Sequence, residues 1–317
     1  MVNENNSTKE KVLNVLKRND GPVSGSDLSL LLKVSRTSVW KAVQSLQNSG
    51  YKIIAEKKGY RLEDINADIL CPLEFGTEKD RFVHFTETDS TMNEARKIAL
   101  KSLEENDRQT RVVTADSQTD GKGCGNHKWK TMRGSLAYTM VTFPKLLSHE
   151  TGREIMVSQI AMVQTLKGMT DKDFFLRWPN DIWSADGKVG GILGETLCRG
   201  PSCSFMNIGV GLNVFASPNM AFTDKIFNSR ARVTRKEILS NFIAEFNRLQ
   251  TLVMEESDGL QKLWNRFNYD SNKKIKVDQK GEFIFSGIDR YGSAILNSTK
   301  DDSKHIFNQG SVKYEKH

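Results

Sequence analysis

Residues 118–129 form the segment whose composition best suits the binding of an anion. The segment reads Gln-Thr-Asp-Gly-Lys-Gly-Cys-Gly-Asn-His-Lys-Trp, with three glycines alternating with other residues. Glycines let backbone N–H groups approach an anion closely, and Lys122 adds positive charge. The spacing is neither that of a P-loop nor that of a dinucleotide-binding turn. From these residues alone, an anion-binding loop and a flexible turn both stay open.

A second segment places polar side chains near Lys188. Residues 178–181, Trp-Pro-Asn-Asp, are expected to end a strand and to present an amide beside a carboxylate, a pair that suits a metal ion or a polar ligand. Lys188 stands just before the glycines 190–191, where a lysine can hold a phosphate or stabilise a crowded transition state. The alternative is a turn that carries a surface lysine.

A third segment, residues 89–91, reads Asp-Ser-Thr and follows a predicted strand. The hydroxyls of Ser90 and Thr91 can bind a small polar ligand or cap the following helix. The residues alone favour capping.

Composition sets the class of protein. A chain of 317 residues has room for two or three domains, and 38% hydrophobic with 27% charged residues is typical of globular proteins. No apolar run approaches the roughly 20 residues of a membrane span, and the polar start lacks a signal peptide, so we expect a cytoplasmic protein with no membrane partner. The four cysteines are expected to be free thiols; Cys198 and Cys203 flank a predicted hairpin turn, and their spacing is poor evidence for zinc.

The first 64 residues predict three helices followed by a two-stranded hairpin. The first helix spans 8–17 and the third spans 36–48. The second is capped by Ser24 or Ser26 and has Leu28, Leu31 and Leu32 on its inner face. The two strands span 51–55 and 60–62. This order is that of a winged helix-turn-helix.

This segment also carries a surplus of positive charge. It has 11 Lys and Arg against 7 Asp and Glu, so 11 − 7 gives +4 of the chain's net +7. We expect the third helix to enter the major groove of operator DNA and the turn of the hairpin to contact phosphate. The expected DNA contacts are Arg36, Thr37, Ser38, Lys41 and Gln44 on the helix and Lys57 and Lys58 on the turn. A protein–protein module, or a small helical domain with a solvated basic face, is the alternative.

The rest of the chain alternates strands and helices, which predicts a mixed α/β domain with much antiparallel pairing. Predicted strands span 82–85, 112–115, 136–141, 174–178, 192–197 and 205–214, and predicted helices span 94–103, 153–168 and 235–255.

Taken in order, these segments resemble the biotin–protein ligase family and, with the N-terminal head, its subclass of bifunctional ligases and biotin operon repressors. The likeness rests on five segments and spans nearly the whole chain, including residues 285–292, which read Phe-Ser-Gly-Ile-Asp-Arg-Tyr-Gly. The five segments are 89–91, 118–129, 178–181, the run Lys-Val-Gly-Gly-Ile-Leu-Gly-Glu at 188–195, and Ile-Gly-Val-Gly-Leu-Asn at 208–213.

The resemblance implies an α+β multidomain fold. It divides the chain into a winged helix-turn-helix (1–64), a mixed α/β ligase domain like those of class II synthetases (65–268) and a small SH3-like β-barrel (269–317). It implies a two-step reaction in which biotin and MgATP give biotinyl-5′-AMP, from which biotin passes to a lysine of a biotin carboxyl carrier protein domain. Orientation and charge neutralisation would supply the catalysis.

The resemblance also implies a role for each matching residue. Lys188 and Lys122 would be catalytic, and Asn180 and Asp181 would hold Mg²⁺. Biotin would be bound by Ser90, Thr91, Gln118, Gly121, Lys122, Gly123, Lys188 and Gly191, and the nucleotide by Trp129, Asn180 and Asn213.

Three positions of the loop depart from the family pattern. Cys124 and His127 stand where the family has arginine, and Asn126 stands where it has glycine. Fewer guanidinium groups give fewer bidentate contacts to phosphate, so we expect weaker retention of the adenylate.

The resemblance further implies a homodimer when the adenylate is bound, which places two heads on a two-fold operator. Two alternatives stay open: a lipoate–protein ligase-like enzyme, and a biotin-sensing repressor with weak ligase activity.

Overall fold

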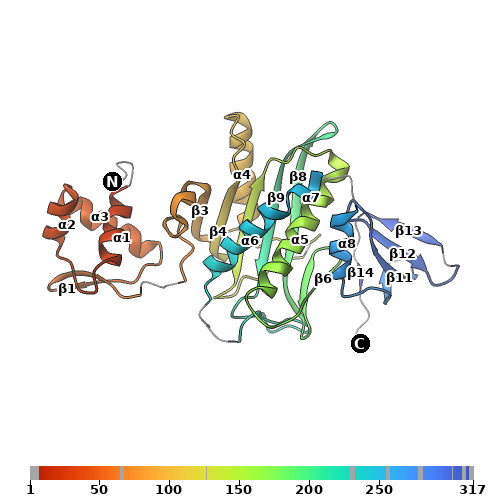
Figure 1. The fold of residues 1–317 in the computed structure, drawn as a ribbon. Helices are drawn as coiled ribbons and strands as arrows, with labels where there is room; N and C mark the ends of the chain where they lie inside the picture. The colour runs from red at the N-terminus through yellow and green to blue at the C-terminus, as the bar shows by residue number, and fades with distance from the viewer. Residues whose placement is uncertain are drawn as a thin grey trace. The chain divides into compact units, whose positions relative to one another are not determined.

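The computed structural model of the chain describes residues 7–64, 68–125, 127–228, 233–254, 258–277, 281–301, 303–308 and 312–313 (Figure 1). The chain forms two compact units, Met1–Asp80 and Arg81–His317. None of the helices in these ranges is both long enough and apolar enough to cross a lipid bilayer.

The first unit is a winged helix-turn-helix. Helices α1 (Thr8–Lys17), α2 (Gly25–Leu32) and α3 (Arg36–Asn48) precede the antiparallel strands β1 (Ile53–Glu56) and β2 (Gly59–Leu62). Each helix begins after a serine whose hydroxyl accepts a backbone N–H of the first turn, which satisfies one of the unpaired donors there. The capping serines are Ser7, Ser24 and Ser35. The predicted elements are confirmed within a few residues.

One prediction for this unit is wrong. Leu31 was expected on the inner face of α2, but its side chain is 65% exposed. Leu28 is buried and Leu32, one turn further on, packs against the same core. Because Leu31 precedes Leu32 by one residue, it points about 100° away from it, and this short helix buries only one side.

Residues that follow the hairpin pack against the same unit. The 3-10 segment η1 (Pro72–Arg81) places Glu74 where its carboxylate accepts a hydrogen bond from the Tyr51 hydroxyl at 2.6 Å and pairs with Lys17 at 2.7 Å. Burial, followed by the hydrogen bond to Glu74, raises the pKa of Tyr51 far above its ordinary value. The segment after the hairpin is therefore attached to the helical core.

The second unit is built on a seven-stranded sheet in the order β3-β4-β5-β9-β8-β7-β6. β3 and β4 are parallel, and all other neighbours are antiparallel. The strands are β3 (Phe82–Thr88), β4 (Arg111–Gln118), β5 (Leu136–Thr142), β6 (Phe174–Arg177), β7 (Asp181–Ser184), β8 (Lys188–Arg199) and β9 (Ser202–Leu212). The predicted mixed α/β domain is confirmed.

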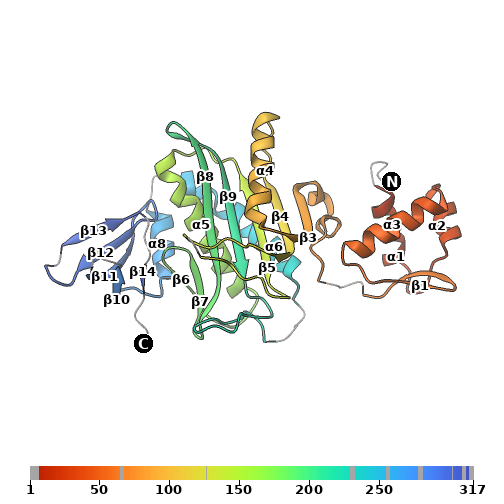
Figure 2. The same ribbon diagram turned by 180° about the vertical axis from the view of Figure 1, so that it is seen from behind.

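Helices cover both faces of this sheet (Figures 1 and 2). Helix α4 (Thr91–Glu104) packs on β4, β5 and β9, whereas α5 (Thr151–Lys167) and α6 (Arg235–Leu249) lie on the opposite face. The predicted helix 235–255 is divided into α6 and α7 (Thr251–Met254). Strand β7 and helix α8 (Gly259–Arg266) were not predicted.

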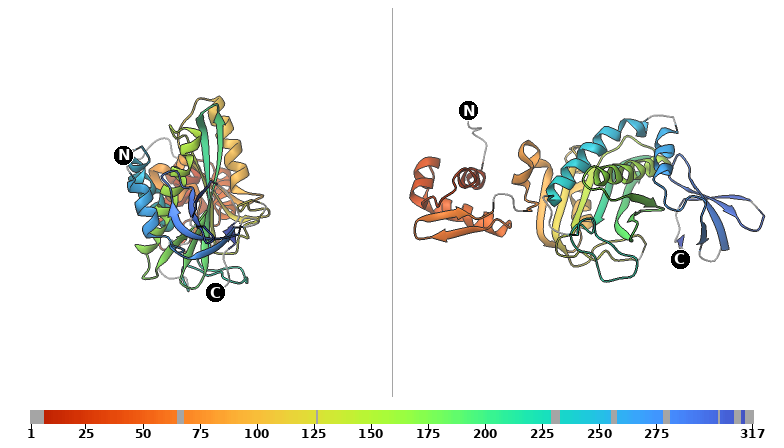
Figure 3. Two further views of the ribbon diagram at one scale, coloured as in Figure 1. Left: turned by 90° about the vertical axis from the view of Figure 1, so that its right-hand side faces the viewer. Right: turned by 60° about the horizontal axis from the view of Figure 1, so that its bottom comes forward.

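A second, smaller sheet ends the chain (Figure 3). It comprises β10 (Lys274–Val277), β11 (Gly281–Ile288), β12 (Ala294–Ser298), β13 (Lys304–Phe307) and β14 (Val312–Lys313), in the order β13-β12-β11-β10-β14. Within the described residues, β13 pairs only with β12 and β14 only with β10, so the sheet is open. The predicted closed SH3-like barrel is therefore not confirmed.

Candidate functional site

The residues predicted to hold a small ligand meet at the start of α4. Ser90 caps α4, with its hydroxyl accepting the N–H of Met92 at 3.2 Å. Thr91 donates its backbone N–H to Oε1 of Gln118 at 2.8 Å and its hydroxyl to the same oxygen at 3.2 Å. Helix capping, which the residues alone favour for Ser90, is confirmed, and the structure also brings Ser90, Thr91 and Gln118 together.

Two threonines that sequence reasoning missed extend this cluster. Thr139 of β5 is fully buried and donates its hydroxyl to that of Thr91 at 2.9 Å. Thr131 accepts the amide N–H of Gln118 at 3.0 Å. The chain of bonds holds the Gln118 side chain in one orientation. No local motif marks these threonines, because strand pairing and loop closure bring them to Gln118.

The glycine-rich loop closes on itself as a short hairpin. The N–H of Trp129 donates to the carbonyl of Gly121 at 2.7 Å, and the N–H of Gly123 donates to that of His127 at 2.8 Å. A Cβ at Gly121 would lie 2.5 Å from the Trp129 carbonyl oxygen, so a larger residue does not fit there. Lys122 and Cys124 are exposed on this hairpin, and Asn126 lies outside the described residues.

Trp129 joins the loop to the centre of the sheet. A Cβ at Gly211 would lie 2.4 Å from Cε2 of Trp129, so the indole ring packs directly on the glycine backbone of β9. The ring nitrogen of Trp129 is buried and has no hydrogen-bond partner among the described residues. A buried N–H donor without a partner is costly, which makes this atom a candidate contact for a bound ligand.

The second cluster surrounds Lys188 at the start of β8. Its ammonium lies 2.6 Å from Oδ1 of Asp181, and both side chains are partly exposed. Asn180 and Asp181 also border Gly191, where an added Cβ would lie 3.4 Å from the Asn180 carbonyl oxygen. The structure thus brings together Lys188, Asn180, Asp181 and Gly191.

Strand register places both clusters on the same face of the sheet. Ala137, Gly211, Gly191 and Asp181 are successive partners across β5, β9, β8 and β7. Directly paired residues of antiparallel strands point to the same face. A Cβ at Gly209, the next position on this face of β9, would meet Met92 of α4 and Thr139. The candidate site therefore occupies the α4 face, at the end of β9 that carries Gly211.

The turn that carries Asn180 and Asp181 is held from behind by buried contacts. The guanidinium of Arg177 pairs with the carboxylate of Asp270 through two hydrogen bonds of 2.9 and 3.2 Å. It also lies over the ring of Trp183, 4.2 Å from the centroid. The ring nitrogen of Trp178 donates to the carbonyl of Gly292 at 3.0 Å. Residues of the C-terminal part of the chain therefore support this turn.

A second support comes from α5 and α8. The amide of Gln159 donates to the carbonyl of Pro179 at 2.7 Å, and its oxygen accepts the ring N–H of Trp264 at 2.6 Å. Gln159 and Trp264 were not predicted as site residues, since they lie far from the motifs in sequence.

Asn213 takes a supporting position. It is buried, and its amide donates to the carbonyls of Asp224 at 3.0 Å and Lys188 at 3.4 Å. Asp224 in turn donates its N–H to the Lys188 carbonyl at 2.9 Å. The side chain of Asn213 therefore helps to hold the backbone of Lys188.

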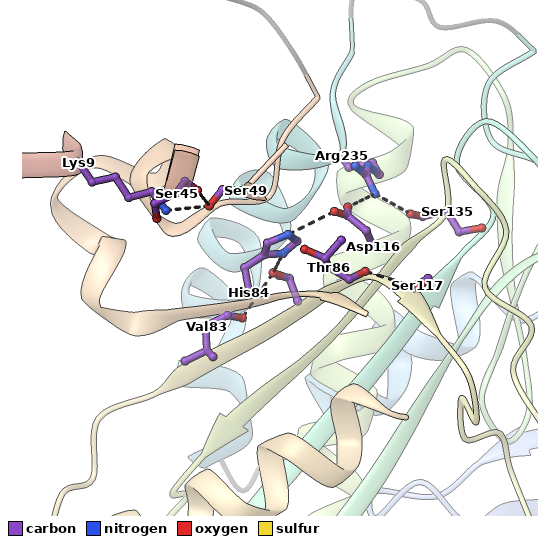
Figure 4. A network of polar contacts seen from close by, with 11 residues as sticks. Lys9, Ser45, Ser49, Val83, His84, Thr86, Asp116, Ser117, Ser135 and Arg235 are labelled. Atoms are coloured by element: carbon purple, nitrogen blue, oxygen red, sulfur yellow. Dashed lines mark hydrogen bonds and ion pairs between the residues drawn. The ribbon is translucent and has the colours of Figure 1, made fainter. Parts of the chain in front are cut away.

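A polar network on the other face of the sheet has a structural role (Figure 4). Asp116 of β4 lies 3.3 Å from the ring of His84 and 3.2 Å from the guanidinium of Arg235, which also donates to the Ser135 carbonyl. Burial opposes ionisation of Asp116, but the hydrogen bond from His84 and the charge of Arg235 hold its pKa below the usual value. The network ties the start of α6 to β4.

In the first unit, most of the predicted DNA contacts are exposed, and Arg36 lines one hollow with Lys57 and Lys58. Arg36, Thr37, Lys41 and Gln44 are exposed on α3, and Lys57 and Lys58 are exposed at the β1–β2 turn. The hydroxyl of Ser38 lies 2.8 Å from that of Ser35 at the helix start. The turn needs glycine at 59, because this residue has a φ of +135° and a Cβ there would lie 2.2 Å from the Val23 carbonyl oxygen.

Comparison with known families finds a match in each of the two units. Residues 8–61 match the model of a helix-turn-helix domain, and residues 85–213 match that of the biotin/lipoate A/B protein ligase family. Over these ranges the chain is similar to a helix-turn-helix domain and to the biotin/lipoate ligase family, so the predicted resemblance to bifunctional ligase/repressors is confirmed.

Individual relatives extend the match. The chain is 28% identical over 200 residues to the bifunctional ligase/repressor BirA of Bacillus subtilis, covering 62% of each chain. It is 25% identical over 297 residues to BirA of Escherichia coli, covering 86% of this chain and 87% of that one. The match thus spans less than two thirds of the Bacillus protein.

Solved structures share the fold over most of this chain. The biotin protein ligase of Aquifex aeolicus in complex with biotin and ATP superposes with a TM-score of 0.58 at 19% identity. The superposition covers 74% of this chain and 99% of that one.

Proposed function

We propose that this chain is an ATP-dependent biotin–protein ligase that also represses transcription through its DNA-binding head. The observation that carries the proposal is the arrangement on the α4 face of the sheet. A hydrogen-bonded polar cluster at Thr91 and Gln118 lies on the same face as the Lys188–Asp181 pair, with Trp129 packed between on Gly211. Such a face offers a polar end that can bind the ring system of biotin and a cationic end that can meet its carboxylate and the phosphate of ATP.

The first step would form biotinyl-5′-AMP. A carboxylate oxygen of biotin attacks the α-phosphorus of ATP, and pyrophosphate leaves. Ser90, Thr91 and Gln118 would bind the ring system, together with Gly121, Gly123 and the backbone of Gly191.

Two lysines would meet the negative charge of this step. Lys188, oriented by Asp181 and by the backbone bonds that Asn213 supports, would neutralise the charge that gathers at the carboxylate and the phosphate. Lys122 would add charge from the glycine-rich loop, and Trp129 with Asn180 would contact the nucleotide.

The second step would transfer biotin to a carrier protein domain. The amine of a carrier lysine attacks the carbonyl carbon of the mixed anhydride, and AMP leaves with the bonding electron pair. The site needs no covalent intermediate with the enzyme, so orientation of the two reactants supplies much of the rate.

Magnesium would enter with ATP. Within the described residues no three His, Cys, Asp or Glu side chains gather as a ready metal site. Mg²⁺ in nucleotide enzymes commonly takes one or two carboxylates and completes its shell with phosphate oxygens and water. Asp181 and Asn180 fit that incomplete donor set, and a bound ion would neutralise phosphate charge there.

The repressor activity would follow from dimerisation of the adenylate-bound protein on operator DNA. Strand β7 pairs with β8 only as far as Gly191, and within the described residues the remainder of β8, up to Arg199, has no strand on that side. An open strand edge is a template for pairing with a second copy.

We propose domain bounds of 1–64, 65–268 and 269–317 for head, ligase domain and C-terminal domain, the last completing an SH3-like barrel.

The test is transfer of biotin to a purified carrier domain in the presence of MgATP, followed by intact mass spectrometry. The proposal expects a mass gain of one biotin on the carrier, and none with Lys188→Met. Modification by lipoate but not biotin would establish the lipoate ligase alternative. Tight biotin binding without transfer would instead indicate a sensor with weak ligase activity.

A further inference from the structure

Trp40 is a large aromatic side chain that the helix-turn-helix core leaves exposed. It lies on α3, and 53% of its surface is accessible. The inward side of α3 is formed by Val39, Ala42, Val43 and Leu46. Trp40 lies one turn after Arg36 and one turn before Gln44, so the three side chains form a row along the helix surface.

Cationic side chains lie at the start of α3 and at the nearby β1–β2 turn. Arg36, Val39 and the turn residues Lys57 and Lys58 line a hollow of about 290 Å³ between α3 and the β1–β2 turn. In the described part of the chain, no ion pair engages Arg36, Lys41, Lys57 or Lys58. The acidic residue at the hollow, Glu56, is paired with Arg61 at 2.8 Å. Trp40 is therefore one helical turn from Arg36, a cation of this hollow, and precedes Lys41 in the sequence.

These features suit the major groove of duplex DNA. The groove admits one α-helix, with phosphates along both of its rims and base edges on its floor. Lys57 and Lys58 at the turn can meet a rim, while the row of Arg36, Trp40 and Gln44 faces the floor. Thymine is the one base that presents a methyl group there, and apolar side chains recognise it by contact.

We propose that Trp40 reads thymine by packing its indole ring on thymine C5-methyl groups in the major groove. The inference rests on the proposed DNA-binding function. It specifies that Trp40 of α3 selects thymine. The lysines at the turn contact phosphate, and they contribute affinity without sequence preference.

The test uses DNA from the region upstream of the protein's own gene, prepared once with thymine and once with uracil in place of thymine. This exchange removes the C5-methyl groups and keeps base pairing and phosphate charge. Affinity is measured by fluorescence anisotropy at fixed salt, with full-length protein, biotin and MgATP. Wild-type protein is expected to bind the uracil DNA more weakly, by about fourfold for each methyl lost, which corresponds to about 0.8 kcal/mol per buried carbon.

Two variants make the test specific. Trp40→Ala should bind thymine DNA more weakly than wild type and should not distinguish thymine from uracil DNA. Lys57→Ala should bind both DNAs more weakly by the same factor, with the slope of log affinity against log salt reduced by about one, and should keep the wild-type preference. Because both side chains are exposed, circular dichroism should show both variants folded.

Two results overturn the inference. Equal affinity of wild-type protein for the two DNAs contradicts it, and so does an unchanged preference for thymine DNA in Trp40→Ala. In either case DNA binding itself stands. Failure of wild-type protein to bind either DNA at low salt overturns the repressor function and this inference together.

Discussion

Asp270 is expected to be one of the most sensitive positions for the stability of the second unit. Its carboxylate is 2% exposed and makes two hydrogen bonds to the buried guanidinium of Arg177. Asp270→Ala leaves that guanidinium without its counter-ion in the interior. Breaking one side of a buried ion pair costs about 3–5 kcal/mol, since the remaining charge has lost its solvent and its partner.

Packing sets the size of the effect within this range. Arg177 lies over Trp183 and Tyr269, at 4.2 and 5.2 Å from the ring centroids, and these contacts persist in the variant. We expect a loss of about 3 kcal/mol, with a coupling free energy of at least about 1 kcal/mol between Asp270→Ala and Arg177→Ala.

Urea unfolding followed by tryptophan fluorescence measures this loss. Trp178 follows Arg177 in the sequence and Trp183 lies under its guanidinium, so their emission reports on the unit that contains the pair. Additive effects of the two single variants, or a loss below about 1 kcal/mol for Asp270→Ala, would refute the assignment of this pair as a buried support of the Trp178–Asp181 turn.

Three further variants test other features. Burial raises the pKa of Glu154 to about 7. A glutamate in the unfolded chain has a pKa of about 4.3, so the folded protein loses stability as the pH rises from that value to about 7. Glu154→Gln should therefore raise the free energy of unfolding in urea by up to about 3 kcal/mol at pH 8 but by little at pH 4.5. An equal gain at both pH values would contradict the raised pKa. Asn207 is fully buried, and neither polar atom of its side chain has a hydrogen-bond partner among the described residues. Asn207→Val should therefore raise the free energy of unfolding by about 1–3 kcal/mol. A fall in Tm would show instead that the amide is hydrogen-bonded. Gly211→Ala inserts a Cβ 2.4 Å from Trp129 and should lower the free energy of unfolding by about 1–3 kcal/mol, measured by thermal unfolding. Gly21→Ala is the control, because a Cβ there meets no atom within 4 Å. Equal Tm values for the two variants would contradict the close packing of Trp129 on Gly211.

Sequence reasoning located those elements whose signals are local. The spacing of Val39, Val43 and Leu46 and the stop at Gly50 predicted a helix over about 36–48, and α3 spans Arg36–Asn48. Residues 178–181 were expected to end a strand, and β6 does end at Arg177, but the chain then reverses so that Asp181 begins β7. Strands of four residues give too little periodicity to be recognised beside such a turn.

Features that depend on tertiary contacts were not predictable. The pairing of Arg177 with Asp270 joins residues 93 positions apart, and no pattern in one sequence marks it. The hydroxyl of Thr139 reaches Thr91 only because β5 and α4 pack together. Conversely, Ser90, Thr91 and Gln118 were named from the motifs and lie together, as do Lys188, Asn180, Asp181 and Gly191. Their roles toward biotin and ATP stay predictions.

ATP–pyrophosphate exchange that depends on biotin tests the central claim most directly, because it needs neither carrier protein nor DNA. The account predicts that purified protein with magnesium exchanges labelled pyrophosphate into ATP only when biotin is present, and that Lys188→Met loses at least about a hundredfold in rate. Exchange that is independent of biotin, or that survives Lys188→Met at the wild-type rate, would contradict an adenylating site at Lys188.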